Sequence, residues 1–167
     1  MNRIRVLTAG VLCGLPLLAA AQALPATQGQ RTRQVLHLVE RARPDSISFQ
    51  DALPAGPSLG DRLVYSADLY DRSGRLVGRD GVDCVTVRID PSASPDRQQT
   101  VQCLASVELF GQGQIAAQSL AQGTSNYFAI TGGTGRFRGV RGEVLVEDVT
   151  PLVEANLTFT LVDGAAE

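Results

Sequence analysis

The sequence predicts an all-β protein built as a single eight-stranded antiparallel up-and-down β-barrel. Three observations indicate this: about eight segments have strand composition, short turn-forming stretches join them, and no stretch shows the periodicity of an amphipathic helix. Short connections favour antiparallel neighbours, and a sheet with this many strands tends to close on itself to remove its edges. A two-sheet sandwich is the alternative.

The first half of the barrel is predicted from alternation and turn residues. Gln34–Glu40 has strand composition, and the Pro-, Ser- and Gly-rich stretch Arg41–Gly60 reads as a long connection with a short extended piece at Ile47–Phe49. Arg62–Tyr70 alternates strictly with period two, which is typical of a strand. After the turn Asp71-Arg72-Ser73-Gly74, the chain returns as the long strand Leu76–Ile89, with a kink expected near Gly78 or Gly81.

The second half repeats the same pattern around a glycine-rich turn. The apolar run Tyr127–Ile130 enters a stretch with three glycines in four residues, Gly132, Gly133 and Gly135, which suits backbone conformations that a Cβ would penalise. We expect strand, glycine corner, strand here. The remaining strands are predicted at Thr100–Phe110, Gln114–Ser119, Gly142–Glu147 and Ala155–Val162.

The first 23 residues predict a secretory signal peptide. A basic lead, Met1 to Arg5, precedes the apolar core Val6 to Ala20, and Ala21-Gln22-Ala23 has the A-x-A form of a cleavage site. The core is shorter than the ~20 residues that span a bilayer, so a membrane anchor is the weaker alternative, and no other stretch predicts a membrane span. We therefore expect a disordered lead at residues 24–33, one barrel domain at residues 34–163 and a periplasmic or secreted protein.

Composition excludes several function classes. The 15 basic and 17 acidic residues include no lysine, and the arginines form no basic face with interleaved aromatic residues. Nucleic-acid binding is therefore not expected, and Schiff-base or Walker-type phosphate chemistry lacks its lysine. One histidine cannot form a histidine-based metal cluster, so no metal site is predicted.

Two cysteines remain after signal removal, Cys84 and Cys103. A hairpin centred between Ala93 and Ser94, inside a Pro/Ser-rich turn, would place them directly opposite each other and within disulfide reach. We predict a structural disulfide, as expected for an oxidising compartment. The alternative is two free thiols, one of them in a binding cavity.

Several segments match a known family of barrels: Leu59–Tyr65 (LGDRLVY), Cys84-Val85 and, as the most specific, Phe128–Gly135 (FAITGGTG) followed by Gly142-Glu143-Val144. In these segments the sequence resembles the allene oxide cyclase barrels, and the plant dirigent proteins share the same glycine corner and barrel. The resemblance implies a barrel whose lumen holds an apolar substrate, cyclisation without a cofactor, and assembly into trimers.

Most polar residues of the family's pocket are replaced by other residue types in this chain. His37 takes the place of the glutamate that allene oxide cyclases have on the first strand, Val39 and Ala67 take the places of two asparagines, and the dirigent aspartates fall near Ser66 and Ala67. Of the family's pocket positions, only the one at Cys84 has the same residue type in this chain. The resemblance therefore does not bring allene oxide cyclase activity itself to this chain.

Candidate site residues follow from strand placement. His37, Asp68 and Glu108 are candidate acid–base residues, because a side chain that points inward would have its pKa shifted by burial. Candidate ligand-binding residues are Tyr65, Cys84, Tyr127 and Phe128.

Two functions remain open at this point. One is a cofactor-free cyclase or isomerase of a small apolar metabolite, which works mainly by restricting geometry. The other is a non-catalytic barrel that acts as a carrier, scavenger or structural protein.

Overall fold

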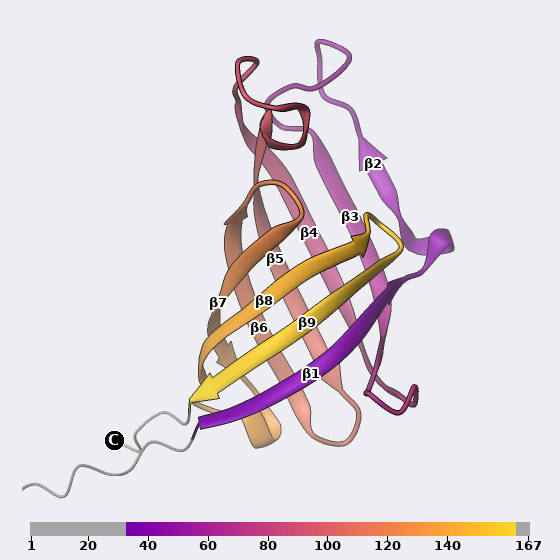
Figure 1. The fold of residues 1–167 in the computed structure, drawn as a ribbon, viewed down its shortest axis with the longest axis vertical. Helices are drawn as coiled ribbons and strands as arrows, with labels where there is room; N and C mark the ends of the chain where they lie inside the picture. The colour runs from indigo at the N-terminus through magenta and orange to yellow at the C-terminus, as the bar shows by residue number, and fades with distance from the viewer. Residues whose placement is uncertain (1–32, 163–167) are drawn as a thin grey trace, which may run out of the picture.

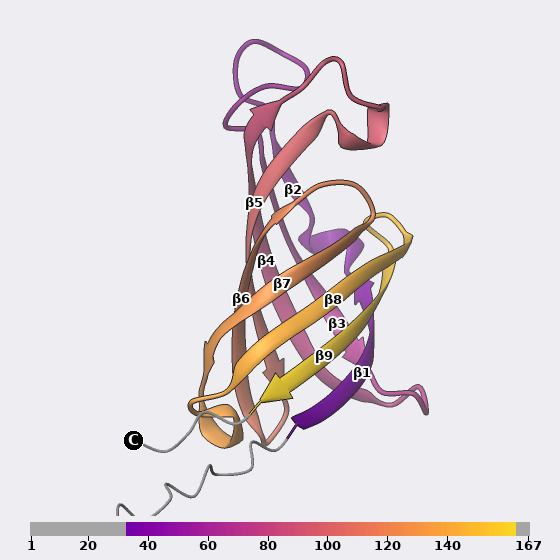
Figure 2. The ribbon, with the colours of Figure 1, turned by 60° about the vertical axis from the view of Figure 1, so that its left-hand side comes forward.

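Nine strands form one antiparallel sheet that closes into a barrel in the computed structural model, which describes residues 33–162 (Figures 1 and 2). The order is β1-β9-β8-β7-β6-β5-β4-β3-β2, and the additional pairing of β1 with β3 closes the barrel. The predicted eight-stranded barrel is confirmed, with β2 as one extra short strand. The strands are β1 (Arg33–Ala42), β2 (Ser48–Gln50), β3 (Arg62–Tyr70), β4 (Leu76–Ile89), β5 (Gln99–Leu109), β6 (Gly113–Ala121), β7 (Ser125–Gly133), β8 (Arg141–Thr150) and β9 (Glu154–Val162).

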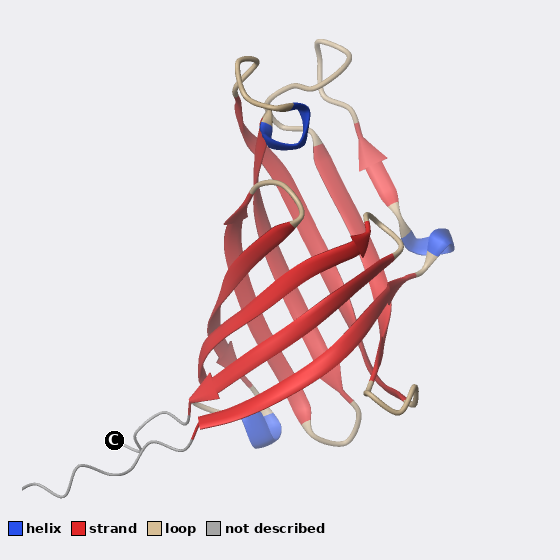
Figure 3. Ribbon diagram, in the orientation of Figure 1, coloured by secondary structure: helices blue, strands red, loops and turns tan. Residues whose placement is uncertain are grey.

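Helical structure among the described residues is limited to three single turns of 3-10 helix (Figure 3). These are η1 (Pro44–Ser46), η2 (Pro95–Arg97) and η3 (Gly135–Phe137). None of the helical segments within residues 33–162 has the length and apolar character needed to cross a membrane. The predicted signal peptide, residues 1–23, and residues 24–32 lie outside the described part of the chain.

Strand β3 closes the barrel by pairing with two different segments along its length. Its second half, Ala67–Tyr70, pairs with Val39–Ala42 of β1, and its first half, Arg62–Val64, pairs with Ser48–Gln50 of β2. Between these segments the chain passes through η1, where the Arg43 N–H and the Ser46 hydroxyl both donate to the Ser66 carbonyl of β3. The extended piece expected at Ile47–Phe49 is therefore the strand β2, shifted by one residue.

The β3–β4–β5 region follows the predicted hairpins. The Asp71–Gly74 turn is closed by a hydrogen bond from the Gly74 N–H to the Asp71 carbonyl, 2.8 Å from N to O. The register of β3 against β4 shifts at Val77, next to the predicted kink at Gly78, and β4 shifts again against β5 at Val87. Between these two irregularities the ladder is regular, which keeps one set of alternating β4 side chains on the inner face.

One end of the barrel is packed solid. Phe159 has no exposed surface, and Leu69 and Ile115 are almost equally buried beside it. The turn η3, which lies at the lower end of the barrel in Figure 1, adds Phe137 to this core. The hydrophobic core therefore fills the end of the lumen that the glycine corner closes.

The glycine corner requires glycine for steric reasons. Gly135 has φ of +58°, which side chains disfavour, and a Cβ on Gly133 would lie 2.6 Å from the Phe137 carbonyl oxygen. The close backbone approach lets η3 fold over the barrel end. The predicted sequence of strand, glycine corner and strand is confirmed as β7, η3 and β8.

Candidate lumenal site

The lumen is hollow at the end opposite η3. A cavity of about 220 Å³ opens between the β6–β7 and β8–β9 turns, where Gly123 and Leu152 line its mouth. A second space of about 40 Å³ continues toward the packed end. Both spaces are lined by the same five residues, which form the waist between them: Glu40, Tyr65, Val82, Phe128 and Val146.

Two carboxyl groups lie close to this waist: Glu40 lines both spaces, and Asp80 lines the inner one. Glu40 of β1 shares the inner face with Leu38, and Asp80 of β4 shares it with Val82, because alternate residues of a strand point to the same side. Both are buried, with 6% of Glu40 and 7% of Asp80 exposed. The pairing of β1 with β3 and of β3 with β4 brings them together across one intervening strand.

Tyr65 and the backbone of β3 hold the two carboxyl groups. The Tyr65 hydroxyl acts on Glu40 and lowers its pKa, and the Ala67 N–H donates a hydrogen bond to Asp80 Oδ1, with an N–O distance of 3.0 Å. Loss of hydration on burial also raises the pKa of Tyr65, and the neighbouring carboxylates add to the effect. Tyr65 is therefore a hydrogen-bond donor throughout the neutral range.

Burial perturbs the acidity of both carboxyl groups strongly. Loss of hydration raises the pKa of Glu40 from 4.5 to about 7, although the hydrogen bond from Tyr65 works in the opposite direction. Loss of hydration, together with repulsion from Glu40, raises the pKa of Asp80 from 3.8 to about 8. A carboxyl group with a pKa near neutrality can donate and accept a proton at physiological pH, which is the property of a general acid–base catalyst.

Two further acidic residues line the mouth. Asp148 of β8 contributes to the wall of the larger cavity, and burial raises its pKa. Glu154 of β9 lies in the same wall but forms an ion pair with Arg41, with 3.0 Å between Oε2 and Nε.

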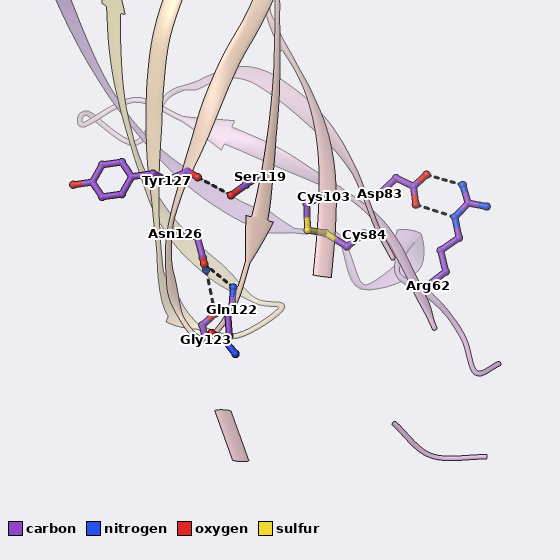
Figure 4. Close-up of a disulfide and its surroundings, with 9 residues drawn as sticks. All are labelled: Arg62, Asp83, Cys84, Cys103, Ser119, Gln122, Gly123, Asn126 and Tyr127. Carbon is purple, nitrogen blue, oxygen red and sulfur yellow. Dashed lines mark hydrogen bonds and ion pairs between the residues drawn. A yellow bond between two sulfur atoms is a disulfide. The ribbon is translucent and has the colours of Figure 1, made fainter. Parts of the chain in front are cut away.

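The predicted disulfide is present in the cavity wall (Figure 4). Cys84 of β4 and Cys103 of β5 face each other in the ladder, with Cα atoms 4.1 Å apart, as the hairpin argument predicted. Both line the larger cavity. On the neighbouring position of β4, Asp83 forms a two-contact ion pair with Arg62 at 2.6 and 2.8 Å.

Beside the mouth, side-chain hydrogen bonds connect β6 and β7 where the backbone pairing of the two strands has ended. The pairing of β6 with β7 ends at Gln118, and beyond it the Ser119 hydroxyl donates to the Tyr127 carbonyl at 2.6 Å. The Gln122 N–H donates to Asn126 Oδ1 at 2.7 Å, and the Asn126 amide donates to the Gly123 carbonyl (Figure 4). These bonds hold the mouth of the cavity on its β6–β7 side.

The structure brings three of the four predicted ligand-binding residues together. Tyr65, Cys84 and Phe128 all line the larger cavity. Tyr127 lies on the outer face of β7, where 61% of its surface is exposed.

The three predicted acid–base residues lie on the outer face. His37 Nδ1 is 3.2 Å from the Thr158 hydroxyl on the neighbouring strand, and Glu108 accepts a hydrogen bond from Arg79 at 2.7 Å. Asp68 lies opposite Arg79 in the β3–β4 ladder, between two buried neighbours that point inward. None of the three contacts the lumen.

Sequence reasoning missed Glu40 and Asp80, although a signal for both was present. Asp80 precedes Cys84 by four residues on the same strand, so alternation places the two on one face. Glu40 likewise shares a face with Leu38. His37 was matched to the family's first-strand glutamate, whereas the first strand does carry a lumenal glutamate three positions later.

The family of the chain is shown by comparison with known proteins. Residues 45–161 match the family described as allene oxide cyclase barrel like domain. The chain belongs to this family. The match begins after β1, so Glu40 lies outside the segment that it aligns. No curated protein matches the chain.

Solved structures of the family's fold support the assignment. A pyocyanin demethylase is 28% identical, with a TM-score of 0.65, over 77% of this chain and 99% of its own. The Diels–Alderase AbmU from Streptomyces koyangensis is 15% identical, with a TM-score of 0.65, over 83% of this chain and 72% of its own. A pterocarpan synthase dirigent protein is 16% identical, with a TM-score of 0.61, over 87% of this chain and 99% of its own.

Proposed function

We propose that the protein is a cofactor-free cyclase or isomerase that holds a small apolar metabolite in its lumen and transfers protons through Glu40 and Asp80. In this proposal the larger cavity receives the metabolite and the waist carries the chemistry. Tyr65 orients Glu40, and the apolar walls exclude water from the reacting atoms.

One observation carries the proposal. Two buried carboxyl groups, which have no basic partner in the described part of the chain, lie at the floor of an open cavity, and burial brings their pKa values to about 7 and about 8. Buried carboxyl groups cost stability when they ionise, so a barrel that served only as a scaffold would gain by an apolar replacement. Retaining both in a solvent-connected cavity is typical of a catalytic site.

The names of similar proteins support a chemical role. The demethylase, the Diels–Alderase and the pterocarpan synthase dirigent protein are each named for a reaction of a small organic molecule. The demethylase is the most informative of these three, since its whole length is matched at 28% identity. These likenesses support a reaction in the lumen without identifying the substrate.

A non-catalytic carrier is the second candidate. The inner space is lined almost entirely by apolar side chains such as Val144, Leu157 and Phe159, which suits binding alone. We also propose that the protein is exported to the periplasm or beyond the cell, which the predicted signal peptide and the disulfide support. The family resemblance supports a homotrimer.

Hydrogen exchange with solvent during turnover tests the catalytic proposal. Native mass spectrometry of protein from its own host, followed by organic extraction, identifies the co-purifying metabolite. Incubating that metabolite with the protein in D₂O should give deuterium in the recovered metabolite or its product. We expect Glu40→Gln and Asp80→Asn each to reduce the incorporation rate by a factor of about 10² or more.

Glu108→Gln is the matched control, because Glu108 is a strand carboxylate on the outer face. It should leave deuterium incorporation unchanged. If the extracted metabolite binds but gains no deuterium and forms no product, the protein is a carrier and the catalytic proposal is wrong. An unchanged rate in both lumenal variants would also refute the assigned roles.

A further inference from the structure

Every charged side chain that lines the lumen is acidic. Among the residues that the structure describes, those around the two cavity spaces include Glu40, Asp80, Asp148 and Glu154 but no arginine. The chain has no lysine to supply the missing positive charge. The lumen therefore holds carboxyl groups, which become negative when they ionise, inside an apolar wall.

The barrel's arginines neutralise carboxylates on the outside instead. Arg79 pairs with Glu108 and Arg62 with Asp83, each across neighbouring strands. At the mouth, Arg41 pairs with Glu154. Within residues 33–162 neither Glu40 nor Asp80 forms an ion pair, so their charge is left for a ligand to compensate.

Among the described residues, no other group around the two carboxyl groups could compensate their charge. Tyr65 faces them from β3 and Asp148 from β8, and neither becomes positively charged. Strands β5, β6, β7 and β9 contribute only uncharged side chains to the inner space: Ala105, Val107, Ala117, Phe128, Leu157 and Phe159. Cys84 and Cys103 are bonded to each other and do not titrate.

Two aromatic rings complete the binding surface. Tyr65 and Phe128 line both the larger cavity and the inner space. The electron-rich face of an aromatic ring attracts a cation, and more strongly where water is excluded. Aromatic walls and carboxylates therefore favour the same ligand property, a positive charge on an apolar body.

We propose that the ligand of the lumen is a small organic cation with an apolar body, whose charge lies against Glu40 and Asp80. This inference names the substrate class of the proposed function and rests on the lumen being its binding site. A cation at the waist stabilises both carboxylates, so binding at neutral pH releases protons from them to the buffer.

Three bicyclic probes of similar shape and different charge test the inference. They are the cation 1-methylquinolinium, the neutral 1-methylnaphthalene and the anion 1-naphthoate, each titrated into the purified protein at pH 7.5. We expect the cation to bind at least tenfold more tightly than the neutral probe and the anion to bind most weakly. The apparent binding enthalpy of the cation should differ between phosphate and Tris buffers, because protons are released.

Variants separate the charge effect from shape. The Glu40→Gln/Asp80→Asn double variant should bring the cation-to-neutral affinity ratio close to one and abolish the buffer dependence of the enthalpy. Glu108→Gln should change neither. Circular dichroism confirms that each variant is folded.

The outcomes distinguish this inference from the proposed function. If the neutral probe or the anion binds as tightly as the cation, the charge preference is wrong, although the lumen remains a binding site. If none of the three probes binds, both the inference and the ligand-holding lumen fail. If the cation binds most tightly but the extracted metabolite gains no deuterium, the inferred charge preference is correct and the protein is a carrier rather than an enzyme.

Discussion

The stability of the protein should fall as the pH rises from about 4 to about 8, and Asp80→Asn should remove much of this dependence. The pKa of Asp80 is about 8 in the folded protein against an ordinary value of 3.8, and that of Glu40 is about 7 against 4.5. Between these values the folded state holds protons that the unfolded chain has already released. Raising the pH therefore favours unfolding, the reverse of the usual effect of an ion-paired carboxylate.

The size of the effect follows from the same values. Moving a carboxyl pKa from 3.8 to about 8 corresponds to roughly 6 kcal/mol of unfolding free energy, because each pKa unit is worth about 1.4 kcal/mol. The cavity is open at its mouth, so water and side-chain relaxation offset part of this. We take about 3 kcal/mol as the stabilisation of Asp80→Asn at pH 8, which for a domain of this size raises Tm by roughly 10 °C.

Thermal unfolding followed by circular dichroism at several pH values between 4 and 8 measures the effect. The Tm of the wild type should fall as the pH rises from 4 to 8. The Tm of Asp80→Asn should fall much less over this range and should be close to that of the wild type near pH 4. The amide can still accept the Ala67 N–H bond, so the variant tests charge rather than shape. Glu108→Gln, which removes only an exposed ion pair worth up to about 1 kcal/mol, should keep the wild-type slope.

A flat wild-type profile between pH 4 and 8 would refute the reasoning. So would an Asp80→Asn variant with the same slope as the wild type. Either result would mean that water or a nearby group compensates the charge of Asp80 in the folded protein.

Three further predictions concern the barrel wall and core. Replacing Cys84 and Cys103 with serine should cost about 3 kcal/mol, seen as a lower midpoint in urea, since the disulfide closes a chain separation of 19 residues; an unchanged midpoint would refute this. Ala121→Phe should fill part of the larger cavity and weaken probe binding at least tenfold without unfolding the protein, while Leu104→Phe on the outer face leaves binding unchanged. Phe159→Ala should cost about 3–5 kcal/mol in chemical denaturation, because the side chain is completely buried in the packed end, and a loss below about 1 kcal/mol would contradict that packing.

Strand order and pairing could be predicted because they depend on local signals. The turn at Asp71–Gly74 and the glycine corner define hairpins, and each hairpin sets the register of its two strands. The disulfide shows both the reach and the limit of this, since Cys84 does lie opposite Cys103 as the turn predicted. The pairs nearest the turn, such as Ile89 with Gln99, are offset by one residue from that prediction, and the extra residue Val87 between the turn and Cys84 restores the predicted register.

The position of Glu40 and Asp80 inside the lumen could not be predicted from such local signals. Alternation divides each strand into two faces but does not say which face is inside. Asp68 of β3 and Glu108 of β5 lie outside, whereas Glu40 of β1 and Asp80 of β4 lie inside. A rule that polar residues face water would assign all four to the surface.

The sequence by itself determined the strands, their antiparallel order, the glycine corner and the disulfide, because each depends on residues that are neighbours along the chain or across one hairpin. Only the tertiary structure decided that the sheet closes through β1 and β3, which brings Glu40 within reach of Tyr65 and Asp80. Acidity near neutrality arises from that closure, because it removes water from two carboxyl groups that are 40 residues apart in the chain.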